Sequence, residues 1–215
     1  QDAAQEDVLR VIEAVNSDDR IHGCLLFRPL PKQFNDEAIR NALLPEKDVD
    51  GITDGSLAGV YAGTKQGFPP CTPAACMEIL DYYGIETTGK RATIIGRSLV
   101  VGKPAAMMLI QRNATVTVCH TKTVDMPGVC RQAEILIVAA GRAGIVGKEY
   151  FSEGQTVIDV GINVDDQGNL CGDVNFGEAE HIVGAITPVP GGVGTVTTSV
   201  LVKHVIEAAE RKQKR

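Results

Sequence analysis

The chain has 215 residues, of which 44% are hydrophobic and 22% are charged, and its formal net charge is -6. These values are typical of a globular protein with a sizeable core, and the absence of a basic stripe argues against a nucleic-acid binder. No apolar run approaches the ~20 residues that a membrane span needs, and no signal peptide is recognised, so we expect a cytoplasmic protein. The basic cluster at 211–215 is typical of a helix end.

Six cysteines are scattered along the chain, at positions 24, 71, 76, 119, 130 and 171. No two of them form a C-x-x-C pair and no histidine pair has zinc-ligand spacing, so the sequence predicts neither a metal site nor a disulfide framework. Most lie in apolar runs, which is typical of small buried side chains in a reducing compartment. Because the chain begins at Gln1 rather than Met, we expect a processed form or a fragment.

The first quarter of the chain predicts two helices, one strand and a loop. Residues 5–16 place apolar side chains on one helical face, and 21–27 form a compact apolar run that predicts a buried strand. The sequence RPLP then ends this strand, because proline cannot continue a ladder. Residues 35–44 predict a short helix, and the acidic, glycine-punctuated segment 45–59 predicts a loop.

A further helix is predicted shortly after this loop. Thr72 is expected as its N-cap, Pro73 as its first residue and Gly84 as its stop signal.

From Arg91 onward, apolar strands alternate regularly with helices. The strands are expected within 91–96, 114–120, 133–141, 156–161 and 181–192, and the helical segments within 101–113, 124–132, 147–151 and 197–213. Residues 163–174 predict an irregular or hairpin excursion. The alternation predicts an α/β fold with a parallel sheet covered on both faces.

Polar groups are expected at the carboxyl ends of two neighbouring strands, where ligands bind in such sheets. Gly96, Arg97 and Ser98 end one strand just before a helix, so backbone N–H groups there can face a phosphate. Gly96 and Gly102 permit tight turns and close approach. Their spacing is G-x-x-x-x-x-G and not the dinucleotide fingerprint G-x-G-x-x-G, so the pattern alone is weak.

The end of the second strand discriminates between cofactors. A free ribose 2′-OH usually meets Asp or Glu there, but the sequence CHTKT supplies hydroxyls and Lys122 and no carboxylate. Together with Arg97, these groups suit a 2′-phosphate and favour NADP over NAD. The alternative is that Arg97 and Lys122 are solvated loop charges, and the residues alone leave both interpretations open.

Four motifs follow one another along the chain: PEKDVDG (45–51), PCTP (70–73), GRSLVVGKP (96–104) and TPVPGGVG (187–194). In this order they resemble the bifunctional methylenetetrahydrofolate dehydrogenase/methenyltetrahydrofolate cyclohydrolase family. Each motif alone is modest, but the resemblance covers essentially the whole chain. The combination of DVDG with PVPGGVG argues against another NADP-linked dehydrogenase, such as a shikimate-type enzyme.

The resemblance implies a two-domain α/β fold. A Rossmann-like, parallel-sheet NADP domain is expected at 73–187. An α/β catalytic domain of the amino-acid-dehydrogenase-like type is expected at 1–72 and is completed by the C-terminal segment 188–215.

The resemblance also implies an activity. The expected reaction is NADP-dependent oxidation of 5,10-methylenetetrahydrofolate to the 5,10-methenyl form; hydrolysis to 10-formyltetrahydrofolate, which the family performs at the same site, stays open for this chain. This reaction belongs to one-carbon metabolism and purine biosynthesis. The expected partners are a tetrahydrofolate derivative and a second copy of the chain in a homodimer.

The resemblance assigns site residues by position in these motifs. Asp50 is the candidate catalytic residue, because one carboxylate can accept two hydrogen bonds from the N–H edge of a pterin. Asp48 is instead expected to act as a solvated turn or N-cap residue. The implied cofactor contacts are Gly96, Arg97, Ser98, Thr121 and Ile162, and the implied substrate contacts are Leu26, Phe27, Arg28, Asp50, Pro190, Gly191, Gly192, Val193 and Thr197.

The chain departs from the family pattern at positions that bear on proton transfer. The family carries its general acid/base lysine in a Y-x-x-x-K motif on an early helix, whereas the Y-x-x-x-K here, Tyr61 to Lys65, follows the Asp50 loop. We therefore do not transfer that role to Lys65. Phe27 stands where the family has glutamine, and phenylalanine cannot form hydrogen bonds. The helix start after GGVG is also altered, with Thr195 in place of proline.

Three explanations of these departures stay open. The chain is a fragment whose upstream part carries the lysine, or a divergent dehydrogenase with weak cyclohydrolase activity, or a non-catalytic NADP- or folate-binding relative. Hydrolysis needs proton shuttling more than hydride transfer does, so the loss of glutamine should affect hydrolysis more.

Overall fold

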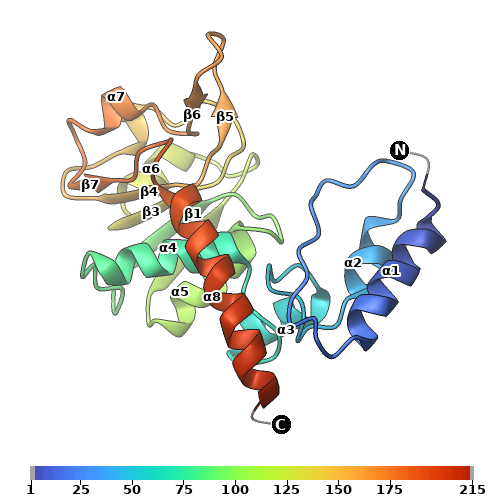
Figure 1. Cartoon of the computed structure of the whole chain (residues 1–215). Helices are drawn as coiled ribbons and strands as arrows, with labels where there is room; N and C mark the ends of the chain where they lie inside the picture. Colours follow the sequence, from blue (N-terminus) through green and yellow to red (C-terminus); the bar gives the residue numbers. More distant parts are fainter. Residues whose placement is uncertain (1–2, 214–215) are drawn as a thin grey trace. The chain divides into compact units, whose positions relative to one another are not determined.

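The computed structural model describes residues 3–213 and divides into two compact units (Figure 1). Unit 1 consists of the chain up to Cys71 and the C-terminal part from Ser199, and unit 2 is Thr72–Thr198. Residues 188–198, expected with the first part, belong to unit 2. The reason is that helix α8, Val193–Gln213, begins next to the last strand of unit 2 and continues into unit 1.

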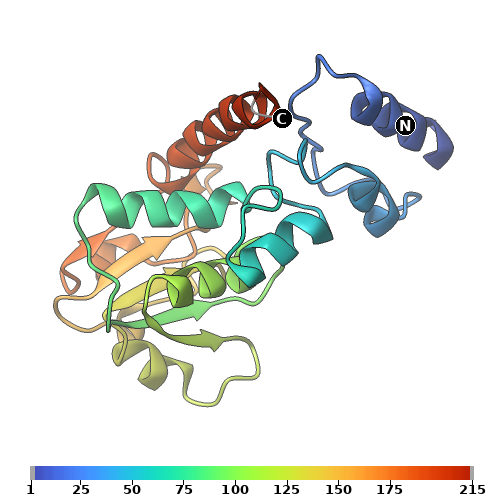
Figure 2. The ribbon, with the colours of Figure 1, turned by 90° about the horizontal axis from the view of Figure 1, so that it is seen from below.

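Unit 2 is built on a five-stranded parallel sheet with the strand order β2-β1-β3-β4-β7. Its central strand β3 is buried at every position, as an apolar run covered on both faces should be. Helix α5, Gly102–Gln111, packs against β1 and β2 (Figure 2). The predicted parallel α/β sheet is therefore confirmed. The strands are β1 Arg91–Ile95, β2 Thr115–Cys119, β3 Ile135–Val138, β4 Thr156–Asp159 and β7 Ala185–Ile186.

The remaining elements of unit 2 connect these strands. The predicted excursion at 163–174 contains a two-stranded antiparallel hairpin, and the short helix α7 near residue 176 was not expected. These elements are α6 Met126–Arg131, η1 Lys148–Tyr150, β5 Asn163–Val164, β6 Leu170–Cys171 and α7 Phe176–Ala179.

Helix α4, Cys71–Tyr82, differs from its predicted start. It begins at Cys71, so the expectation that Thr72 is the N-cap was wrong and Thr72 lies inside the first turn. Pro70 directly precedes the helix, and the proline ring at position 73 is tolerated in the first turn because no intrahelical N–H is needed there. The stop signal is confirmed, since Gly84 has a φ of +65° and its N–H donates to the carbonyl of Asp81.

Unit 1 contains α1 Gln5–Ser17, α2 Asp36–Ala42 and α3 Asp54–Ala62. The first two helices pack their apolar faces together around buried Ile12 and Ile39. Helix α3 lies where the sequence predicted a loop. Its start is fixed by the Thr53 hydroxyl, which accepts the N–H of Ser56, and by the acidic first residue at the positive end of the helix dipole.

The strand predicted at 21–27 is not formed, and that expectation was wrong. Cys24 makes one parallel bridge with Asp48, and its N–H donates to the carbonyl of Lys47 over 2.8 Å. Within residues 3–213 no second pairing extends this bridge into a ladder, so the apolar run stays irregular. Phe27, at its end, leaves 84% of its surface exposed.

Within the described part of the chain, no helix combines the length and apolar character needed to cross a bilayer. The same residues hold no group of three or more His, Cys, Asp or Glu side chains arranged for a metal ion. All six cysteines are free thiols, and Cys71, Cys76, Cys119 and Cys130 are buried.

Candidate active site

The turn after β1 contains two glycines, Gly96 and Gly102, whose backbones lie very close to neighbouring carbonyl groups. Gly96 has a φ of +122°, and a Cβ there would lie 2.4 Å from the carbonyl oxygen of Ala139. A Cβ on Gly102 would lie 2.1 Å from the carbonyl oxygen of Gly96. No side chain fits at either position without displacing a carbonyl group, so the tight turn requires glycine at both.

The same turn leads into the positive end of α5. The Ser98 hydroxyl accepts the N–H of Val101 over 3.1 Å, and the Ser98 carbonyl accepts the N–H of Lys103 over 3.0 Å. The N-cap residue Val101 itself makes no side-chain cap hydrogen bond, and Arg97 and Ser98 are exposed. This arrangement can hold a phosphate, because a helix N-terminus attracts negative charge and an arginine can pair with it.

The end of β2 lies beside this turn, since Ile95 of β1 pairs with Cys119 of β2 in parallel register. Thr121 and Lys122 follow and are exposed. The nearest carboxylate along the chain, Asp125, accepts the N–H of Gly128 and caps α6, so it is already engaged. The residues present therefore fit a nucleotide with a phosphate on its ribose better than one with a free 2′-OH.

A cavity of about 220 Å³ lies in unit 2 at the carboxyl ends of β4 and β7. Its lining brings Ile162, a predicted cofactor contact, together with Pro190, Gly191, Gly192 and Val193, the predicted substrate contacts. Ile162 is 68% exposed, and a Cβ on Gly194 would lie 3.7 Å from its Cδ1 atom.

Thr197 is the predicted substrate contact of unit 2 that is not among the lining residues of this cavity. Its hydroxyl donates to the carbonyl of Val193, one turn earlier in α8. The mostly apolar lining of this cavity can face an aromatic ring.

In unit 1, Asp50 is partly buried on a segment that several side chains hold in place. The thiol of Cys71 lies 3.3 Å from the Val49 carbonyl, and Nδ1 of His204 lies 2.9 Å from the same oxygen. Burial raises the pKa of Asp50, a hydrogen bond from Cys71 lowers it, and the nearby charge of Asp48 raises it further. Burial also raises the pKa of the Cys71 thiol and lowers that of His204, so both groups are neutral near pH 7.

Asp48 has a different role from Asp50. Its carboxylate is fully buried and accepts the N–H groups of Ile52 and Thr53, at 3.0 and 2.8 Å, and the hydroxyl of Ser56 at 2.6 Å. Asp48 thus organises a turn, as one of the expected roles had it, but the expectation of a solvated residue was wrong, because its side chain is completely buried. It organises the chain that enters α3 and leaves Asp50 as the carboxylate available to a ligand.

The other predicted substrate contacts of unit 1 differ from one another. Leu26 packs against the apolar cluster of α1 and α2, and the guanidinium of Arg28 pairs with the carboxylate of Asp36. Phe27 is exposed, as described above. Among these three, Phe27 is thus the side chain that a ligand can reach without displacing a contact.

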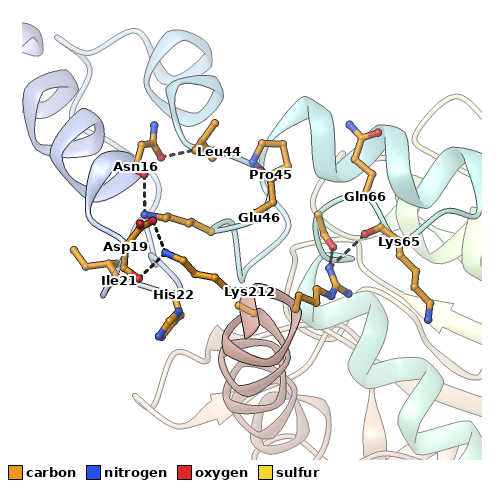
Figure 3. A pocket seen from close by; sticks show the side chains of 14 residues that line it. Asn16, Asp19, Ile21, His22, Leu44, Pro45, Glu46, Lys65, Gln66 and Lys212 are labelled. Carbon is orange, nitrogen blue, oxygen red and sulfur yellow. Dashed lines mark hydrogen bonds and ion pairs between the residues drawn. The ribbon is translucent and has the colours of Figure 1, made fainter. Parts of the chain in front are cut away.

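A second cavity, of about 590 Å³, lies wholly within unit 1 and was not predicted (Figure 3). Lys47 is buried beside it and donates to the carbonyls of Asn16 and Asp18 at the end of α1, while Lys212 pairs with Asp19. Lys65 lines this cavity and Asp50 does not. The geometry therefore gives no support for moving the family's acid/base role to Lys65.

We expect Gly102→Ala to disrupt the nucleotide turn. The methyl group would overlap the Gly96 carbonyl, and overpacking of this kind costs about 1–3 kcal/mol of unfolding free energy. Denaturant unfolding and NADP titration measure the two effects. Gly177→Ala is the matched control, because its Cβ would meet only the side chain of Asn175 at 4.0 Å. Wild-type stability and NADP affinity in Gly102→Ala would contradict this account of the turn.

Comparison with known proteins supports the resemblance to the tetrahydrofolate dehydrogenase/cyclohydrolase family. Residues 70–213 match the family model of the tetrahydrofolate dehydrogenase/cyclohydrolase NAD(P)-binding domain, and residues 1–50 match the model of the catalytic domain of the same family. The chain is 54% identical over 212 residues to the bifunctional protein FolD of Carboxydothermus hydrogenoformans, covering 98% of this chain and 74% of the relative.

Solved structures agree with this result. The bifunctional FolD enzyme from Campylobacter jejuni superposes with a TM-score of 0.96 and 40% identity, over 98% of this chain and 75% of that one. The enzyme from Trypanosoma brucei, complexed with NADP and an inhibitor, superposes with a TM-score of 0.92 and 34% identity, over 100% of this chain and 75% of that one. The motifs, the nucleotide turn and these matches agree, and the chain belongs to the tetrahydrofolate dehydrogenase/cyclohydrolase family.

Proposed function

We propose that this protein catalyses NADP-dependent oxidation of 5,10-methylenetetrahydrofolate to 5,10-methenyltetrahydrofolate, with hydrolysis to 10-formyltetrahydrofolate as a second activity. The observation that carries the proposal is the pair of strand ends in unit 2. The glycine turn after β1 and the N-terminus of α5 lie beside the end of β2, which carries Lys122. The nearest carboxylate along the chain, Asp125, is engaged as the cap of α6. The relatives of the chain are bifunctional FolD proteins. Bound NADP supplies the hydride acceptor.

The residues of unit 2 hold and orient the nucleotide. We assign the phosphate groups to the backbone N–H of Ser98 and the 2′-phosphate to Arg97 and Thr121, while Gly96, whose own N–H donates to the carbonyl of Cys119, shapes the turn. The exposed side chain of Ile162 shields one face of the nicotinamide. Because hydride transfer depends mainly on the relative placement of two rings, these contacts account for most of what the chain must do in the oxidation.

Asp50 is the residue that we assign to the pterin. Its carboxylate can accept two N–H groups, and the surrounding hydrogen bonds to Val49 fix the backbone that carries it. The backbone of 190–193 contacts the folate ring system, and Leu26, Phe27, Arg28 and Thr197 stay proposed contacts. Hydrolysis of the methenyl product needs a proton donor and acceptor, and Phe27 can supply neither.

Three further properties are proposed. The first is a homodimer, for which the exposed edge strand β2 offers an open row of backbone groups. The second is a cytoplasmic location, consistent with six free cysteines. The third is a place in purine biosynthesis, since 10-formyltetrahydrofolate is the product of the second step.

A spectroscopic assay of the full-length protein tests the proposal. We expect methenyltetrahydrofolate to form from the methylene compound only when NADP is present, and to decay to the formyl product if hydrolysis follows. Nucleotide or folate binding without any turnover would instead identify a non-catalytic relative, and would overturn the assignment as an enzyme.

As the pH is lowered, folate binding should begin to weaken at a higher pH than it would if the binding residue were an exposed aspartate with an ordinary pKa. Asp50 accepts hydrogen bonds only as a carboxylate, and burial raises its pKa above 3.8, so protonation begins earlier as the pH falls. Burial keeps the Cys71 thiol neutral throughout this range, and it lowers the pKa of His204, so that this imidazole gains its charge only at a lower pH than an exposed histidine would. Titration of a stable folate analogue between about pH 8 and about pH 4, without nucleotide, measures the effect. An affinity for the analogue that does not fall on acidification would contradict the role of Asp50.

A further inference from the structure

Two buried carboxylates, Asp159 and Asp173, bind segments that adjoin the nucleotide contacts of unit 2. Their exposed fractions are 3% and 0%. Asp159 ends strand β4, and Asp173 follows the β5–β6 hairpin. The chemistry proposed above uses neither of them. Burying a carboxylate is unfavourable unless its oxygens are hydrogen-bonded, so their partners should show what they do.

Asp173 binds the backbone of the loop that follows β3. Its Oδ2 atom accepts the N–H groups of Ala140 and Gly141, at 2.6 and 2.8 Å. Its Oδ1 atom accepts the N–H of Arg142 and the side-chain amide of Asn163, both at 2.9 Å. A single carboxylate therefore holds three successive backbone N–H groups and one side chain from the segment after β4.

These two segments belong to different parts of the nucleotide site. The segment after β3 begins at Ala139, whose N–H donates to Ile95 and whose carbonyl oxygen would be 2.4 Å from a Cβ on Gly96. It therefore forms one side of the phosphate turn. Asn163 directly follows Ile162, which lines the cavity of unit 2. Asp173 thus connects the segment beside the phosphate turn with the segment that carries Ile162, the residue assigned to the nicotinamide.

Asp159 in turn fixes Asp173. Its Oδ1 atom accepts the N–H groups of Gly161 and Asp173, at 2.9 and 3.1 Å, and its Oδ2 atom accepts the N–H of Val174 at 2.9 Å. The packing leaves no spare room, because a Cβ on Gly172 would lie 1.9 Å from Oδ2 of Asp159. The two carboxylates form one rigid support under both loops.

We propose that Asp173 is a positioning residue for NADP. It does not touch the nucleotide but holds the loop at 139–142 and the Ile162–Asn163 segment at the spacing that the two ends of the nucleotide require. The inference rests on the proposed function, since it takes the phosphate turn and the cavity at Ile162 to be the two ends of one nucleotide site. Its consequence is that the carboxylate of Asp173 sets the affinity for NADP more than it sets the affinity for folate.

Asp173→Asn tests this with little change in shape. One amide NH₂ group would face backbone N–H donors, so at least one of them loses its acceptor inside the protein. We expect the dissociation constant for NADPH, followed by nucleotide fluorescence without turnover, to rise about tenfold. The KM for NADP should rise similarly, while the KM for methylenetetrahydrofolate stays within about twofold.

Asp165→Asn is the matched control. Asp165 lies in the adjacent hairpin, and its carboxylate accepts N–H groups from Gln167 and Asn169 within that hairpin. NADPH affinity should be unchanged in this variant. If Asp173→Asn does not fold, Asn163→Ala carries the test, because it removes one contact of Asp173 and should weaken NADPH binding about threefold.

The outcomes separate the inference from the proposed function. A wild-type protein that binds no NADPH would refute the proposed function. Wild-type NADPH affinity in Asn163→Ala and in a folded Asp173→Asn, with only a lowered unfolding temperature, would show that the carboxylate supports the fold alone and would overturn the inference.

Discussion

Replacement of Arg97 by alanine should convert a protein that prefers NADP into one that barely distinguishes NADP from NAD. Arg97 is exposed at the end of β1, next to a strand end with hydroxyls and a lysine. A charge-assisted hydrogen bond to a phosphate contributes about 1.5–3 kcal/mol, so the dissociation constant for NADP should rise about 10- to 100-fold. NAD lacks that phosphate, and its affinity should change by less than about threefold. Titration of both nucleotides onto the variant measures the ratio.

Arg91→Ala is the control for this experiment. Arg91 stands at the opposite end of the same strand, where its guanidinium donates to the carbonyl of Gln132 over 2.7 Å. Its loss should leave the preference for NADP intact. An equal loss of affinity for NADP and NAD in Arg97→Ala would mean that Arg97 does not bind the 2′-phosphate.

Replacement of Asp50 by asparagine should remove most folate turnover while leaving nucleotide binding intact. The amide has almost the same size, but its NH₂ group would face an N–H donor of the pterin where the carboxylate accepted one. Losing a bidentate, charge-assisted contact lowers kcat/KM for methylenetetrahydrofolate by about 100-fold. NADPH affinity, measured separately, should stay within about twofold. The dependence of folate binding on acid described above should also disappear.

Asp54→Asn is the appropriate comparison for Asp50. Asp54 is an exposed carboxylate of the same unit that pairs with Arg40 and Asn41, and exposed pairs of this kind contribute little to stability. Its kcat/KM should match that of the wild type. If Asp50→Asn also kept kcat/KM within about threefold, the carboxylate would not contact the substrate.

The sheet of unit 2 could be predicted because its strands are short apolar runs separated by helical segments. The inner strands β1, β3 and β4 are buried on both faces along nearly their whole length, so their apolar composition alone indicates a covered parallel sheet. The run at 21–27 has the same composition and yet makes a single bridge, because strand formation also requires a paired neighbour. Helix α3 was missed for the opposite reason. Its glycines and acidic first residue indicated a loop. In the structure, the capping hydroxyl of Thr53 and the burial of Ser56 stabilise a helix instead.

The candidate site could be predicted as far as it depends on local sequence. The glycine turn and the contacts of Asp48 each depend on residues within a few positions of each other, while the grouping of Arg97 with Lys122 follows from the predicted neighbouring strands. The partners of Asp173 could not be found this way, because the carboxylate meets N–H groups 31 to 33 positions away. The burial of Lys47 at the end of α1 could not be predicted for the same reason, because its ammonium group donates to carbonyls 29 to 32 positions earlier in the chain.

The central claim is that NADP binds along the turn after β1 and reaches the cavity at Ile162. Amide chemical shifts followed during NADP titration of the isotope-labelled protein test it directly, without any need for turnover. The account predicts that the largest shifts fall on Gly96, Arg97, Ser98 and Thr121, with a second group at Ile162. Shifts confined to the cavity of unit 1, or the absence of any change at the Gly96 turn, would contradict it.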